Sequence, residues 1–211
     1  MQIRMPTLAG ALVAAAAVVA TAATADAQAE QARRFLEKRH QAVTRVLQRS
    51  AGSEAARAQR NARLDQMLAD LLDYEELAQR SLGSHWDARS ASDRAQFVDL
   101  LKKLVERSYK RNLEQTLRYD VRYTSSEDGT NGVLVRTEAR SRKNRRAPAV
   151  RIDYRLHESG GEWRVYDVIT DGVSMVRNYR NQFNRIIDDE GWPGLIERMR
   201  NKLQSKDDLV E

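Results

Sequence analysis

Hydrophobic residues in the first half of the chain recur at the spacing of amphipathic helices. Residues 29–49 and 54–72 each carry one apolar face, and the small polar segment 50–53 separates them. Asp73, followed three residues later by Glu76, predicts a capped short helix that ends at Gly83. Ser90 with Asp93 predicts the start of a longer helix that runs to about residue 114. The first half of the chain is therefore predicted to be helical.

The pattern changes to a period of two from about residue 119. Apolar and polar residues alternate over 119–123, 133–139 and 150–156, which is typical of strands with one buried face. A turn-rich loop, residues 125–132, separates the first two of these strands, and a basic segment, residues 140–146, separates the next two. Ser159 and two glycines predict a tight hairpin into a fourth strand.

The segment 161–183 predicts a strand, a sharp reversal and a helix. Its first part is rich in β-branched and aromatic residues, and its second part has apolar residues on one helical face: Val176, Tyr179, Phe183 and Ile187. Gly172 lies between the two parts and can adopt the positive φ that a sharp turn needs. Gly191 should end this helix, and Pro193 suits the first turn of a last one.

This order of elements predicts an α+β fold in which N-terminal helices, a curved four-stranded antiparallel sheet and C-terminal helices follow one another. The pattern resembles a cone-shaped fold of the nuclear-transport-factor-2 (NTF2-like) type with added helices. We expect a single domain over residues 28–204 and a polar tail over 205–211.

The N-terminus has the features of a secretory signal peptide. Arg4 precedes an Ala/Val/Leu-rich run, and Ala25-Asp26-Ala27 supplies a small-x-small cleavage site. We therefore expect residues 1–27 to be removed and the mature protein to be exported. The sequence contains no cysteine, so neither a disulfide nor a cysteine-linked lipid anchor is expected.

The charge pattern narrows the classes of partner. The net charge is +6, and the mature chain keeps it because Arg4 and Asp26 cancel. A basic surface can bind nucleic acid, anionic lipid or an acidic protein, and the export signal argues against nucleic acid. The basic segment 140–146 (Arg140, Arg142, Lys143, Arg145 and Arg146) is a candidate docking site for a partner, although it could equally be a solvated surface.

The sequence offers little catalytic chemistry. His40, His85 and His157 have no metal-ligand spacing, so we predict no metal site and no cofactor. Ser174 lacks the Gly-x-Ser-x-Gly context of a nucleophile and is better explained as a helix N-cap. Asp167 and Asp171 are candidate general bases, although a capping role is common beside a turn.

Residues 167–183 also carry a family resemblance. Two motifs in this segment resemble the signature of the MlaC-like family: Asp-Val-Ile-x-x-Gly-Val-Ser-Met-Val and Asn-Tyr-Arg-x-Gln-Phe. Weaker matches occur at Leu82-Gly83, Trp86, Arg94, Phe97 and Tyr109. That family comprises periplasmic phospholipid-binding proteins of the Mla lipid-asymmetry pathway, also called toluene-tolerance auxiliary proteins. The strongest positions of the match are Gly172, Asn178, Tyr179, Arg180, Gln182 and Phe183.

The resemblance implies a non-enzymatic periplasmic shuttle. It would carry phospholipid between an outer-membrane lipoprotein complex and the lipid-binding subunit of an inner-membrane ABC transporter, and so maintain outer-membrane asymmetry. From the inward faces of the expected elements, the candidate contacts to the acyl chains are Phe97, Leu101, Leu104, Val133, Val135, Ile152, Tyr154, Val165, Ile169, Val176, Tyr179 and Phe183.

Two other functions remain open on the sequence alone. A small NTF2-like isomerase or hydrolase would use Asp167 or Asp171 as its base, and an exported interaction protein would have a filled core.

Overall fold

The computed structural model describes residues 13–49 and 52–205, with side chains from residue 25 onward except 111–114. The first part of the expected signal peptide and the tail beyond Ser205 lie outside the described residues. Five helices precede the sheet: α1 (Val13–Gln48), α2 (Glu54–Leu71), α3 (Tyr74–Leu82), α4 (Ser84–Asp87) and α5 (Ala91–Thr116). The sheet strands β1 (Tyr119–Glu127), β2 (Val133–Ser141), β3 (Val150–Ser159), β4 (Glu162–Thr170) and β5 (Val173–Ser174) then lead into α6 (Met175–Gln204).

Side chains at the helix starts act as the predicted caps. The side chain of Asp73 accepts a hydrogen bond from the backbone N–H of Glu76, and that of Ser90 accepts one from Asp93. Ser174 accepts from the N–H of Arg177 at the start of α6. Each bond satisfies a backbone donor that the first helical turn leaves without a partner. The local sequence thus sets where α3, α5 and α6 begin.

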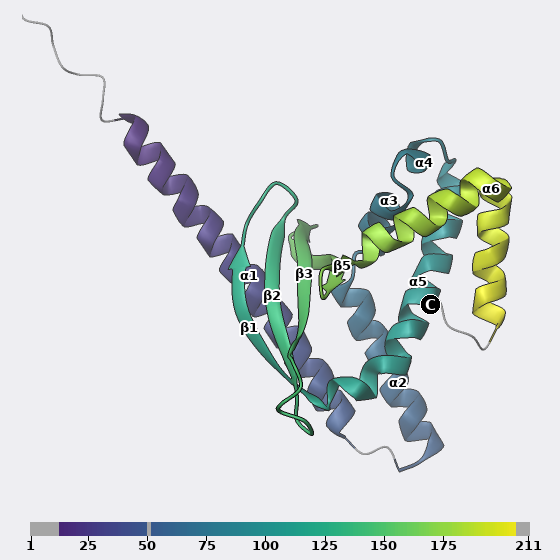
Figure 1. Ribbon diagram of the computed structural model, residues 1–211, viewed down its shortest axis with the longest axis horizontal. Coiled ribbons are helices and arrows are strands. Elements are labelled where there is room, and N and C mark those ends of the chain that lie inside the picture. Colours follow the sequence, from purple (N-terminus) through teal and green to yellow (C-terminus); the bar gives the residue numbers. More distant parts are fainter. Residues whose placement is uncertain (1–12, 50–51, 206–211) are drawn as a thin grey trace, which may run out of the picture.

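The sheet is an antiparallel meander in the order β1-β2-β3-β4-β5 (Figure 1). The prediction of four strands was wrong by one short strand. Asp171 (φ 47°) and Gly172 (φ 86°) both adopt positive φ, so the turn reverses the chain within two residues. The chain therefore pairs with β4 again, Thr170 with Val173 and Ile169 with Ser174, before α6 begins.

Two changes of register interrupt the regular pairing of the sheet. One lies between Tyr123 and Ser125 on β1, and the other lies where Arg155 pairs with Asp167 but Leu156 pairs with Val165. The second change leaves Tyr166 as an extra residue on β4. Such bulges bend a strand and change which residues share a face, and this one decides which β4 residues reach the candidate site.

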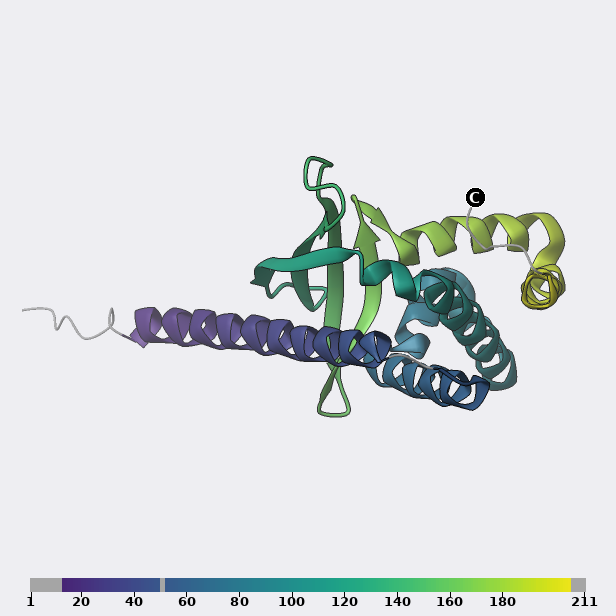
Figure 2. The same cartoon turned by 90° about the horizontal axis from the view of Figure 1, so that it is seen from below.

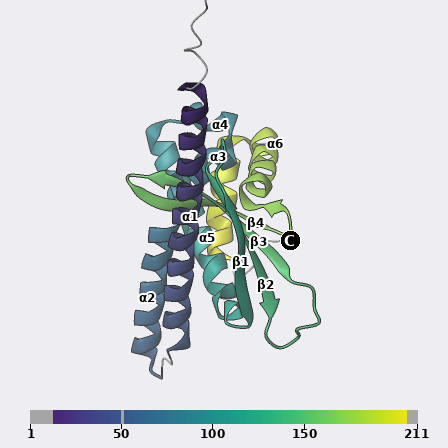
Figure 3. The same cartoon turned by 90° about the vertical axis from the view of Figure 1, so that its left-hand side faces the viewer.

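The helices form a layer against the sheet and a separate bundle beside it. Figure 2 shows α1 running along the sheet, with its N-terminal part extending beyond it, while α2, α5 and α6 lie to one side. Figure 3 shows α1 and α2 side by side. The predicted helix over 29–49 begins earlier, at Val13, in an alanine-rich stretch with strong helix propensity. Within the described residues, no helix is long and apolar enough to cross a membrane.

The break expected at Gly191 is present as a sharp bend inside α6. Gly191 has φ 71° and ψ 180°, a conformation that strongly favours glycine, and Pro193 follows two residues later. The second half of α6 then lies beside α5 (Figure 1), where the Arg107 guanidinium donates to the carbonyls of Lys202 (2.9 Å) and Leu203 (3.0 Å). This contact satisfies carbonyls at the helix C-terminus and fixes the bundle.

Candidate functional site

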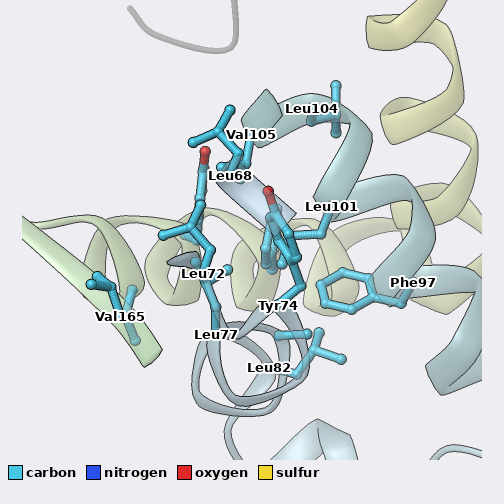
Figure 4. Close-up of a cluster of buried hydrophobic side chains, with 14 of the residues drawn as sticks. Leu68, Leu72, Tyr74, Leu77, Leu82, Phe97, Leu101, Leu104, Val105 and Val165 are labelled. Atoms are coloured by element: carbon cyan, nitrogen blue, oxygen red, sulfur yellow. The ribbon is translucent and has the colours of Figure 1, made fainter. Parts of the chain in front are cut away.

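An apolar cavity of about 390 Å³ lies between the sheet and the helices. Its walls come from α1, α2, α5, β3, β4 and the start of α6. The hydrophobic residues that line it are Leu36, Val43, Leu68, Leu71, Leu72, Val105, Val165, Val168 and Met175. Figure 4 shows how Leu68, Leu72, Val105 and Val165, from three elements, lie around one region of the core. A volume of this size is within the range of about 300–1,000 Å³ that is typical of ligand pockets.

The bulge on β4 determines which of its residues face this cavity. Simple alternation places Val165 and Ile169 on one face and Val168 on the other. Because Tyr166 is an extra residue, Val165 and Val168 both line the cavity, whereas Ile169 does not. Val168 pairs directly with Tyr154 on β3, which also lines the cavity. Sequence reasoning missed Val168 because nothing in its periodicity marks the bulge.

Three of the twelve predicted contact residues line the cavity: Tyr154, Val165 and Tyr179. Ile152 and Ile169 are half-buried and do not line it. The remaining seven are buried in the main hydrophobic core: Phe97, Leu101, Leu104, Val133, Val135, Val176 and Phe183.

Aromatic packing explains the position of the α5 and α6 residues. The Phe97 ring lies 5.4 Å from the Phe183 ring, edge to face, and 5.8 Å from Trp192. These contacts hold α5 against both halves of α6. The cavity instead begins two turns further along α5, at Val105 and Tyr109. Sequence reasoning also left out α1 and α2, whose apolar faces were visible but had no assigned partner.

A polar cleft of about 410 Å³ adjoins the cavity. The two share three lining residues, His40, Thr44 and Thr116, so an occupant could extend from one into the other. The rest of the cleft is lined by Glu37, Gln41, Arg45, Leu117, Tyr119, Asp120, Val121, Tyr123 and Arg142. Charges of both signs therefore face the cleft, and the Arg142 guanidinium is 2.7 Å from the Asp120 carboxylate.

His40 has a different environment from an exposed histidine. It lies at the junction of the cavity and the cleft, and its burial lowers its pKa from the ordinary value, although the nearby Glu37 partly opposes this effect. Burial disfavours the charged imidazolium because the ring loses hydration. A neutral ring at this position is compatible with an apolar occupant.

The two candidate bases hold the turn and the start of α6 together. Asp167 accepts hydrogen bonds from the Ser174 hydroxyl (2.6 Å) and from the backbone N–H of Val176 (3.0 Å). Asp171 accepts from the backbone N–H of Arg151 (3.0 Å). Both carboxylates are therefore capping groups, and neither lines the cavity. Among the described residues, no group of three or more His, Asp or Glu side chains could hold a metal ion.

The polar residues of the family signature fix α6 to its surroundings. Arg180 donates through Nε (2.8 Å) and Nη2 (2.6 Å) to the carbonyl of Arg80 near the end of α3. The Gln182 amide donates to Asn178 (3.2 Å) on the same helix. Tyr179 and Phe183 stack with ring centroids 5.3 Å apart. Of these signature residues, only Tyr179 lines the cavity.

Comparisons with known proteins agree with this architecture. The chain is 28% identical over 136 residues to the intermembrane phospholipid transport system binding protein MlaC of Haemophilus influenzae. That alignment covers 62% of this chain and 64% of the relative, so it spans less than two thirds of the relative's length.

Among solved structures, the fold is similar to that of a phospholipid-binding protein from Ralstonia solanacearum in complex with a phospholipid, with a TM-score of 0.64 and 24% identity. The superposition covers 85% of this chain and 97% of that one. A sequence model of the MlaC protein family matches residues 37–201, which include the cleft, the signature on α6 and every residue that lines the cavity except Leu36. The chain belongs to the MlaC family.

Proposed function

We propose that this protein binds phospholipid in the apolar cavity and carries it through the periplasm. The observation that carries the proposal is a cavity of about 390 Å³ that is lined mainly by aliphatic side chains and shares lining residues with a polar cleft. Acyl chains would occupy the cavity and the headgroup would lie in the cleft. The transport system named for the Haemophilus relative and the phospholipid bound by the Ralstonia protein support this assignment.

The energetics favour a carrier over a protein that releases lipid into water. Two acyl chains hold on the order of 30 methylenes, each worth about 0.8 kcal/mol on leaving water. Spontaneous release would therefore be very slow. Exchange with another apolar site is different, because the large transfer terms then nearly cancel. We infer that the protein passes lipid directly between an outer-membrane complex and the lipid-binding subunit of an inner-membrane ABC transporter.

An exported location is part of the same proposal. The small-x-small site ends at Ala27, and the mature chain would begin at Gln28. Of the α1 side chains that the structure describes, residues 25–28 are exposed or half-exposed, and Ala29 is the first buried one. Cleavage after Ala27 would therefore keep every buried α1 side chain that the structure describes, and residues 28–204 would form the lipid-binding domain.

We propose no catalytic role for this protein. An enzyme of this shape would need a base directed into the cavity, whereas the carboxylates of Asp167 and Asp171 cap the turn and helix beside it. Catalysis would also need polar groups that stabilise the transition state, whereas the walls of the cavity are mainly aliphatic.

Lipid analysis of the purified protein tests the proposal. The mature chain should be exported in a Gram-negative host, purified without detergent and extracted with organic solvent. Mass spectrometry should find about one phospholipid per chain, whereas an unrelated periplasmic protein purified in parallel should contain none. Wild-type protein that carries no lipid and takes none from vesicles would refute the proposed function.

A further inference from the structure

Three tyrosines line the mainly aliphatic cavity: Tyr109 on α5, Tyr154 on β3 and Tyr179 on α6. Within the described part of the chain, none of their hydroxyl groups makes a hydrogen bond to the protein, and none of the three oxygens is a fully buried atom. Buried phenols usually find a partner, because an unpaired hydroxyl in an apolar site is costly. The missing partners are therefore expected to come from the occupant of the cavity.

Two of these phenols, Tyr109 and Tyr154, lie near each other, and Tyr154 also lies near a tyrosine of the cleft. Burial raises the pKa of Tyr109 to about 12, and burial followed by the nearby Tyr109 raises that of Tyr154. Tyr154 is in turn close enough to Tyr123, which lines the polar cleft, to raise its pKa after the larger effect of burial. The phenols thus lead from the cleft into the cavity, and all remain protonated hydrogen-bond donors at neutral pH.

Tyr179 has a different setting. Its ring stacks on Phe183, and burial raises its pKa. It lines the cavity from α6 and is buried, whereas Tyr109 and Tyr154 are half-buried. We therefore assign the polar contact to Tyr109 and Tyr154.

The position of this pair matches one part of a phospholipid. In a diacyl glycerophospholipid the ester oxygens lie between the charged headgroup and the two hydrocarbon chains. A headgroup in the cleft and chains in the cavity would bring the esters to the boundary between the two, beside His40 and Thr44. Methylenes cannot accept a hydrogen bond, whereas ester carbonyls can.

We propose that the hydroxyls of Tyr109 and Tyr154 donate hydrogen bonds to the ester oxygens of the bound lipid, and that the protein therefore prefers ester-linked to ether-linked phospholipids. This inference rests on the proposed function, because it needs a lipid in the cavity. The inference adds the bond between glycerol and hydrocarbon chain, ester or ether, as a determinant of lipid specificity. The headgroup is not part of this selection, since both classes of lipid can carry the same one.

Competition between two synthetic lipids tests the inference. Dipalmitoyl phosphatidylglycerol and its dihexadecyl diether analogue have the same headgroup and nearly the same chains. Delipidated protein would be mixed with vesicles that contain both, and the bound lipids would be counted by mass spectrometry. Each neutral hydrogen bond is worth about a two- to tenfold change in affinity, so wild-type protein should bind the diester at least severalfold better.

The double variant Tyr109→Phe/Tyr154→Phe should remove this preference without emptying the cavity. Phenylalanine keeps the ring and its packing, so both lipids should still bind, with a diester-to-diether ratio near one. Tyr166→Phe is the matched control, because the Tyr166 hydroxyl donates to the carbonyl of Asn131 and does not line the cavity. Its ratio should equal that of wild type.

The possible outcomes separate the inference from the proposed function. If neither lipid binds to wild type, the proposed function fails. If both bind but the double variant keeps the wild-type ratio, the ester assignment is wrong. If the double variant loses affinity equally for both lipids, the hydroxyls contact the phosphate group that both share, and the ester assignment is again wrong.

Discussion

Removing lipid from the cavity should lower the stability of this domain by several kcal/mol. The perturbation is complete delipidation of the mature protein, by solvent extraction of the unfolded chain followed by refolding. An empty, dry cavity costs about 24 cal/mol per Å³. For the 390 Å³ observed here, the cost would be about 9 kcal/mol, which is comparable to the total stability of about 5–15 kcal/mol of a typical protein.

Water reduces this cost but cannot remove it. The junction with the cleft is polar, at His40, Thr44 and Thr116, so water can enter there. The rest of the lining is mainly aliphatic, so water finds few hydrogen bonds there besides those of the tyrosine hydroxyls. We therefore expect a net loss of about 3–5 kcal/mol, within the upper limit set by the dry cavity. A domain of this size loses about 2–4 °C in Tm for each kcal/mol, so the expected decrease is roughly 10 °C.

The assay compares the melting of native, delipidated and re-lipidated protein by circular dichroism. A filling variant, Val168→Trp, adds a ring where the acyl chains would lie. It should bind less lipid and melt at a higher temperature than delipidated wild type. The matched control is Val135→Trp, because Val135 is fully buried and does not line the cavity. Overpacking there should cost about 1–3 kcal/mol or more, with or without lipid.

Two results would refute this reasoning. Equal Tm values for native and delipidated wild type would show that the space is not maintained by an occupant. Equal destabilisation by Val168→Trp and Val135→Trp would show that the core is filled at both positions.

Three further predictions concern charge and hydrogen bonding. Transfer of lipid to partner complexes should slow between 0.1 M and 1 M salt, because the Debye length falls from about 10 Å to about 3 Å. A variant that reverses the exposed charges of Lys143, Arg145 and Arg146 should respond less to salt. Identical salt curves for the two proteins would show that these residues do not contact the partner. Asp167→Asn should weaken the cap of α6 and lower the free energy of unfolding in urea by about 0.5–2 kcal/mol, while lipid occupancy stays unchanged. Loss of a catalytic activity with lipid still bound would contradict this prediction. Burial lowers the folded-state pKa of His40 below its ordinary value of 6.5. The contribution of His40 to stability is therefore complete above about pH 6.5 and is lost as the pH falls through the folded pKa. His40→Gln should flatten the dependence of stability on pH over this range, and an unchanged profile would exclude His40 as the source of that dependence.

The amino-acid sequence by itself determined the elements of this protein and most of their boundaries. The caps at Asp73, Ser90 and Ser174, the reversal at Gly172 and the bend at Gly191 were all predicted and are all observed. Each depends on interactions between residues only a few positions apart, so the local sequence contains all the information needed. The alternation over β2 is local in the same sense, and its buried face was predicted correctly.

The candidate site is different, because its position depends on how separate layers meet. Phe97 and Phe183 have the apolar character expected of a lipid contact, yet they pack against each other between α5 and α6. Periodicity identifies a buried face but cannot say whether that face meets another side chain or a cavity. The choice between the two depends on how the helices pack against the sheet, which no local pattern encodes.

The clearest example of a feature that only the tertiary structure decides is a single extra residue on β4. Tyr166 shifts the register against β3, brings Val168 into the cavity wall and turns Ile169 away from it. The sequence determined that this segment is a strand with one apolar face, whereas only the pairing with β3 decided which residues that face contains. Register is a property of two strands together, and the bulge becomes defined only when both strands are in place.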